Sequence, residues 1–167
     1  MTNRLADLEV KTRNARDQDF MKCVEIIKLA WPGFAERESV YHVFCKYFST
    51  TSFVAESDQK IVGFLLGFLS QTEGHTAYIH LVATHPKYQR KGIARRLYER
   101  FFEAARMSGR NRVNLNVSPD NLVSLEFHKS LGFHPVLTGE TVIVGGVEAA
   151  KDYNGPNNHM VPFEREI

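Results

Sequence analysis

Residues 86–96 combine a proline, several basic side chains and a glycine directly ahead of an amphipathic segment. Gly92 is placed to end an irregular turn and open a helix, whose first amides have no partner within the helix. The helix dipole adds partial positive charge at that end, and Arg90, Lys91, Arg95 and Arg96 strengthen the field. The pattern predicts an anion-binding site. These residues fit equally well a solvated basic helix start in which Gly92 is an ordinary turn residue.

Proton transfer needs side chains such as Tyr78 and His80, which lie in a strand-like segment, residues 76–84. They are two residues apart, so both lie on one face of a strand, where His80 is a candidate base. A polar residue that only lines the sheet is the alternative. His75, His80 and His85 recur every five residues, a spacing that alternates faces, so they cannot converge on a metal ion. We expect no metal site.

The segments that position these residues alternate between helix and strand patterns. In the clearest helix, Ile93, Leu97 and Phe101 repeat every four residues. We expect helices at residues 19–30, 38–48, 92–109 and 121–132. We expect strands at residues 9–16, 52–57, 61–70, 76–84, 112–117, 133–136 and 159–166, with one more at 141–144. Hairpins at the start and crossovers later predict an α/β (α+β) fold, a mixed sheet with helices on both faces.

Two blocks of sequence resemble the motifs of a known family. The segment VATHPKYQRKGIA resembles motif A of the GNAT superfamily of acetyl-CoA-dependent N-acetyltransferases, whose pattern Q/R-x-x-G-x-G/A is met by residues 89–94. Residues 121–133, NLVSLEFHKSLGF, resemble motif B, with Ser124 in place of the usual alanine and His128 where tyrosine is commonest. The order of elements also matches, so the resemblance covers roughly residues 9–166.

The resemblance implies a fold and a co-substrate. It implies a single domain, residues 1–167, with a mostly antiparallel sheet of about six or seven strands flanked by about four helices. Two splayed central strands would form the acetyl-CoA cleft, with the pyrophosphate on the amides of residues 89–94. An amide near Leu81 or Val82 would polarise the thioester carbonyl. The implied acetyl-CoA-binding residues are Leu81, Val82, Thr84, Gln89, Arg90, Lys91, Gly92, Ile93, Ala94, Asn121 and Ser124.

The resemblance also implies catalytic roles. The residue at His128 would approach the thioester sulfur, and a protonated histidine there could return a proton to the leaving thiolate. A helix histidine that only packs is the alternative. Tyr78 and His80 are the candidates for deprotonating the amine, although a water chain could do so without a dedicated base. Glu73, Asp152 and Tyr153 are candidate contacts for the acceptor, while solvated loop residues remain the plainer interpretation.

Composition limits the remaining possibilities. The 167 residues carry a net charge of +2 and are 43% hydrophobic, which suits one domain and argues against a dedicated nucleic-acid binder. The longest apolar run, residues 61–69, is too short to span a membrane, and the charged start has no secretory core, so we expect a cytoplasmic protein. Cys23 and Cys45 are expected as buried free thiols.

Two classes of function stay open. The first is an enzyme, monomeric or homodimeric, that acetylates a small-molecule or peptide amine by direct attack on the thioester of acetyl-CoA. The second is a GNAT-like domain that binds acetyl-CoA as a sensor or interaction module without turnover.

Overall fold

The computed structural model describes residues 9–167, so the charged segment 1–8 lies outside the described residues. The described residues form two compact units, one of residues 9–68 and 81–104 and one of residues 69–80 and 105–167. Strand β4 (Thr76–Thr84) and helix α3 (Ile93–Met107) each contribute to both units. None of the helices in residues 9–167 is long and apolar enough to cross a bilayer.

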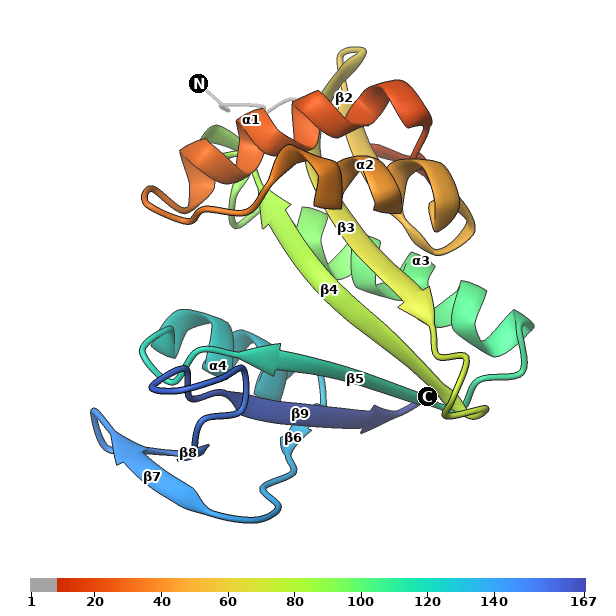
Figure 1. Cartoon of the computed structure of the whole chain (residues 1–167). Coiled ribbons are helices and arrows are strands. Elements are labelled where there is room, and N and C mark those ends of the chain that lie inside the picture. Colours follow the sequence, from red (N-terminus) through yellow and green to blue (C-terminus); the bar gives the residue numbers. More distant parts are fainter. Residues whose placement is uncertain (1–8) are drawn as a thin grey trace, which may run out of the picture. The chain divides into compact units, whose positions relative to one another are not determined.

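The fold is mixed α/β, as the sequence predicts (Figure 1). The helices are α1 (Phe20–Ala30), α2 (Glu38–Tyr47), α3 (Ile93–Met107) and α4 (Leu122–Ser130). A seven-stranded sheet has the order β1-β2-β3-β4-β5-β9-β6. Its strands are β1 (Lys11–Asn14), β2 (Phe53–Ser57), β3 (Lys60–Leu69), β4 (Thr76–Thr84), β5 (Arg112–Val117), β6 (His134–Pro135) and β9 (Val161–Glu166). A separate hairpin contains β7 (Thr141–Val144) and β8 (Val147–Ala150).

The first unit packs helices on both faces of its strands. Side chains from α1 and α2 form one core with Val54, Phe64 and Leu66 of β2 and β3. Alternate residues of the same strands point to the other face, where the Arg100 guanidinium of α3 lies 5.7 Å from the ring centre of Phe53. The alternation along β2 and β3 therefore separates the α1–α2 layer from α3.

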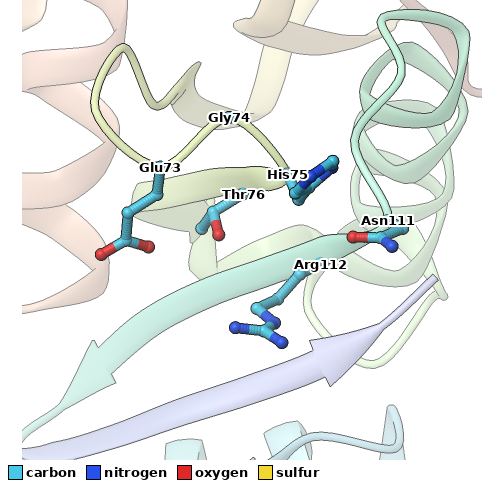
Figure 2. A pocket seen from close by; sticks show the side chains of 6 residues that line it. All are labelled: Glu73, Gly74, His75, Thr76, Asn111 and Arg112. Carbon is cyan, nitrogen blue, oxygen red and sulfur yellow. The ribbon is translucent and has the colours of Figure 1, made fainter.

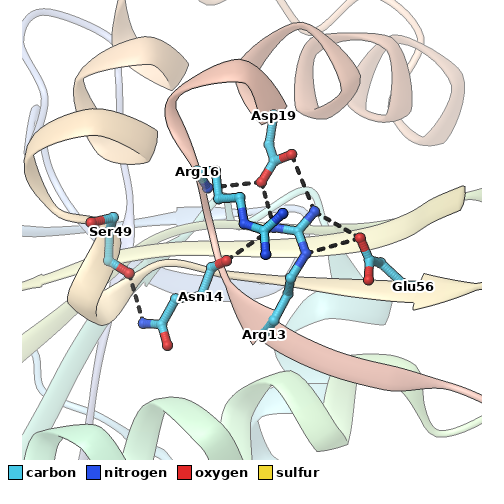
Figure 3. Close-up of polar contacts among 6 residues, drawn as sticks. All are labelled: Arg13, Asn14, Arg16, Asp19, Ser49 and Glu56. Atoms are coloured by element: carbon cyan, nitrogen blue, oxygen red, sulfur yellow. Dashed lines mark hydrogen bonds and ion pairs between the residues drawn. The ribbon is translucent and has the colours of Figure 1, made fainter. Parts of the chain in front are cut away.

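An ion-pair cluster ties β1 to its neighbours (Figure 3). The Arg13 guanidinium lies 2.7 Å from the Asp19 carboxylate, at the start of α1, and 2.7 Å from the Glu56 carboxylate of β2. The hydrogen bond to Asp19 raises the pKa of Arg13, in spite of its partial burial. The cluster fixes where the chain leaves β1 and enters α1.

The two cysteines are free and buried, as the sequence predicts. Cys23 of α1 and Cys45 of α2 are 0% and 1% exposed. The neighbouring Cys45 thiol and burial raise the pKa of the Cys23 thiol, so it stays protonated. Both thiols act as core residues.

The second unit is built on β5 and β9, which pair antiparallel along their whole length from Arg112↔Glu166 to Val117↔Val161. The start of β4 pairs parallel with β5 over three residues, from Thr76↔Arg112 to Tyr78↔Asn114. One face of these strands carries Val113, Leu115 and Phe163, which are buried. The opposite face carries the half-buried polar residues of β4 and β5.

The β7–β8 hairpin corrects the sequence prediction in one respect. The strand expected at residues 141–144 is present, but it pairs with β8, where the sequence patterns predict no strand. Gly145 and Gly146 form the turn, with φ of 55° and 84°. A two-residue Gly-Gly connection with both φ values positive is a favoured hairpin turn, so this strand pair could have been predicted.

Candidate functional site

The loop before α3 has the strand–turn–helix form that the sequence predicts. β4 ends at Thr84, a short 3₁₀ turn spans Pro86–Tyr88, and α3 begins at Ile93. The His85 ring accepts a hydrogen bond from the Lys87 amide at 3.2 Å and so caps the turn. This loop therefore has its own internal order and presents the first amides of α3 at its end.

Two glycines allow this geometry. Gly92 has a φ of +76°, and a Cβ built there would meet nothing within 4 Å. The glycine is required by its left-handed backbone rather than by crowding from the protein. Gly63 of β3 is required by close packing, because a Cβ there would lie 3.1 Å from Ile93 and 3.2 Å from the Ala83 carbonyl oxygen.

The side chains of the loop fit an anion. Residues 89–92 and Arg95 are exposed, and three of them are basic. The Gln89 amide nitrogen donates to the Thr84 carbonyl at 3.3 Å, which brings together two residues predicted to bind the co-substrate. Arg96 instead donates to the Val10 carbonyl at 3.1 Å. The donor set, helix amides with flanking cations, is the one that phosphate groups need.

Helix α4 and its N-cap bring together Asn121, Ser124 and His128 of motif B. The Asn121 carbonyl oxygen accepts the Ser124 amide at 3.0 Å and caps the helix. The Ser124 carbonyl lies 2.6 Å from Nδ1 of His128, and the Ser124 hydroxyl lies 3.3 Å from it. A carbonyl oxygen only accepts, so the Nδ1 atom of His128 carries a proton.

The environment of His128 is unsuitable for a cationic acid. The side chain is 7% exposed, and its ring centre lies 5.7 Å from Phe133 and 6.0 Å from Phe163. Burial lowers the pKa of His128 to about 4, despite the opposing hydrogen bond to Ser124. The imidazole is therefore neutral near pH 7, which argues against the protonated acid expected from the sequence.

Tyr78 makes a contact with β5 that its position in the sequence does not reveal. The Asn116 side-chain amide of β5 donates to the Tyr78 hydroxyl oxygen at 3.0 Å. Burial, together with the nearby Tyr153, raises the pKa of Tyr78 to about 12. The phenol therefore stays protonated near neutral pH and can donate a hydrogen bond, which favours a donor role over the base role expected from the sequence.

The spacing of Asn114 and Asn116 on one face of β5 was a usable signal, because asparagine is depleted in strands. His80 lies two residues beyond Tyr78 on the half-buried face of β4, and Leu81, Val82 and Thr84 follow it along the strand.

The three acceptor candidates differ in their surroundings. Tyr153 is half-exposed, at 49%, and is close enough to Tyr78 to affect its pKa. Asp152 has a local structural role, since its carboxylate accepts the Asn157 amide at 2.7 Å and lies 3.5 Å from His159. Between Tyr153 and Asp152, the structure places Tyr153 near a predicted catalytic residue, Tyr78.

Glu73 lines a different feature of the second unit. It borders a hollow of about 270 Å³ with Gly74, His75, Thr76, Asn111 and Arg112 (Figure 2). The Glu73 side chain extends away from Asn111 in this view. The residues from Glu73 to Thr76 form the turn that leads into β4, in which the Thr76 amide donates to the Glu73 carbonyl at 2.9 Å.

Comparison with known proteins agrees with this geometry. The chain is 29% identical over 85 residues to the L-2,4-diaminobutyric acid acetyltransferase of Nocardia farcinica, covering 51% of this chain and 44% of that protein. It is 38% identical over 66 residues to the L-amino acid N-acyltransferase MnaT of Escherichia coli, covering 40% of this chain and 37% of that protein. The matches span less than half of either relative's length.

A solved structure shares the fold. The diaminobutyrate acetyltransferase EctA from Paenibacillus lautus, in complex with L-2,4-diaminobutyric acid and coenzyme A, matches with a TM-score of 0.71. The match has 22% sequence identity and covers 94% of each chain. The model of the acetyltransferase (GNAT) family matches residues 20–133, more than half of the chain. The chain therefore belongs to the GNAT acetyltransferase family.

Proposed function

We propose that this protein transfers the acetyl group of acetyl-CoA to the amino group of a small acceptor, with a free amino acid or diamino acid as the best candidate class. The observation that carries the proposal is the start of α3, where a positive-φ glycine and exposed basic residues flank the first helix amides, which have no partner within the helix. The names of the relatives support the acceptor class, because they act on diaminobutyric acid and on L-amino acids.

We assign residues 89–94 to binding of the pyrophosphate of acetyl-CoA. Leu81, Val82 and Thr84 are assigned to the pantetheine arm, because the pairing of β4 with β5 involves only the three residues Thr76–Tyr78 of β4 among residues 9–167. Backbone groups of β4 that follow Tyr78 therefore lie outside the β4–β5 pairing. Asn121 and Ser124 of α4 complete the predicted set.

The chemistry needs an unprotonated amine and stabilisation of the negative charge that forms on the thioester. We assign the first task to His80 or to water, and the second to the Tyr78 hydroxyl, which stays protonated. His128 is assigned as a neutral residue that packs against Phe133 and Phe163. Tyr153, and Glu73 more remotely, are the proposed contacts of the acceptor.

The test is release of free CoA from acetyl-CoA in the presence of an amine panel. The panel contains L-2,4-diaminobutyric acid, neutral L-amino acids and a short peptide with a free amino terminus. We expect at least one amino acid to accelerate the release well above hydrolysis in buffer. A chain that binds acetyl-CoA but releases no CoA with any amine would be a binding module, the alternative class.

A further inference from the structure

A side-chain hydrogen bond joins β4 to β5 in the second unit, from the Asn116 amide nitrogen to the Tyr78 hydroxyl oxygen at 3.0 Å. Both residues are half-buried. The backbone register pairs Tyr78 with Asn114, so Asn116 lies two residues farther along β5 and on the same face. Asn116 therefore reaches along the sheet to the tyrosine.

The direction of this bond fixes the hydroxyl group. A phenol has one proton to donate and lone pairs on its oxygen that accept. Asn116 donates its N–H to the oxygen, so the hydroxyl proton must point away from Asn116. Burial keeps that proton in place near neutral pH. A donor with a fixed direction is what an electrostatic role in catalysis requires.

We propose that Asn116 is a positioning residue, which orients the Tyr78 hydroxyl as a hydrogen-bond donor toward the thioester atom that gains negative charge during acetyl transfer. The inference rests on the proposed function. The amine nitrogen bonds to the carbonyl carbon, the carbon–sulfur bond breaks with its electron pair on sulfur, and the nitrogen loses one proton. That proton passes through His80 or water and ends on the thiolate, while Tyr78 keeps its own.

Substitution by aspartate separates orientation from packing. Asn116→Asp keeps the size of the side chain, but a carboxylate only accepts and would draw the Tyr78 proton toward itself. Asn116→Leu removes the N–H that points at the Tyr78 oxygen and so removes this constraint on the direction of the hydroxyl. We expect kcat to fall by about 10²- to 10³-fold in Tyr78→Phe, the loss of one such donor, and nearly as far in Asn116→Asp. Asn116→Leu should lower kcat by about 10-fold or less. Asn116→His keeps an N–H donor, so its kcat should lie between those of Asn116→Leu and the wild type.

Asn114 supplies the matched control. It lies on the same face of β5, and its buried carbonyl oxygen has no hydrogen-bond partner among the residues that the structure describes. Replacing it by leucine removes an unpaired polar group, so Asn114→Leu should fold and should keep the wild-type kcat. The KM for acetyl-CoA should change little in all of these variants.

The deciding measurement is a double-mutant cycle on kcat with the best amine of the panel. If Asn116 acts through Tyr78, then Asn116→Asp should cost nothing further in the Tyr78→Phe background. An additive loss, or a larger defect in Asn116→Leu than in Asn116→Asp, would overturn the inference while leaving the proposed acetyl transfer intact. Full activity in Tyr78→Phe would overturn the inference and the role assigned to the Tyr78 hydroxyl, but not acetyl transfer itself. A wild-type protein that acetylates no amine would instead overturn the proposed function, and the inference with it.

Discussion

At the scale of single residues, the surroundings of His128 and Tyr78 favour other roles than those that sequence alone proposes. His128 occupies the motif position expected to contact the thioester, yet it sits among aromatic rings at 7% exposure. Tyr78 is a candidate base by sequence, yet burial raises its pKa to about 12, which makes loss of its proton still harder. Residue type and motif position select candidates, but the pKa that decides acid, base or neutral donor depends on neighbours distant in sequence.

His128 gives a prediction about stability and pH. Its pKa of about 4 in the folded chain lies below the value of 6.5 for an unperturbed histidine. The unfolded chain binds the extra proton first, so stability is present above about pH 6.5 and is lost as pH falls toward about 4. The loss amounts to about 3 kcal/mol at most.

The measurement is the free energy of unfolding by urea at several pH values between these limits, for wild type and His128→Phe. The difference between the two proteins removes the contribution of the other histidines. We expect the wild type to lose more stability on acidification than the variant. If the free energies of unfolding of the two proteins change in parallel with pH, His128 titrates as an ordinary histidine. A role for His128 as a protonated acid would then be supported again.

At the scale of elements, the start of α3 is the feature on which co-substrate binding depends. Gly92 holds a φ of +76° with no neighbouring heavy atom near its missing Cβ. Gly92→Ala should strain the backbone by about 1–2 kcal/mol and turn the first amides of α3 away from the phosphate position. We therefore expect weaker acetyl-CoA binding by calorimetry.

Gly109 offers a control for the strain alone. It follows α3 with a φ of +73° and likewise has open space around its missing Cβ. Gly109→Ala should lower the melting temperature about as much as Gly92→Ala, but should leave the Kd for acetyl-CoA unchanged. Equal affinity for acetyl-CoA in both variants would remove residues 89–94 from the binding site.

The elements themselves could largely be predicted from the sequence. The helix α3 is predicted correctly by the four-residue repeat from Ile93 to Phe101, and the strand β5 by its alternation, because each pattern reflects one buried face. The Asn116–Tyr78 bond could not be predicted from the sequence, since it joins two residues 38 positions apart and depends on the register between their strands. The burial of His128 by Phe163 of β9 is equally non-local.

At the scale of the whole molecule, the central claim is that the chain is a catalyst rather than an acetyl-CoA sensor. Family membership and the donor set before α3 support binding of a CoA phosphate, and either class would bind. Turnover separates the classes, because only an enzyme makes an amide in proportion to the CoA that it frees.

The most direct test supplies acetyl-CoA with an isotopically labelled acetyl group together with L-2,4-diaminobutyric acid or the best amino acid of the panel. Free CoA and N-acetylated product are measured in the same samples by mass spectrometry. We predict that label appears in the amine product in equal amounts to free CoA, and that product formation depends on active protein. Stabilisation of the chain by acetyl-CoA with no labelled amide from any amine would contradict the claim.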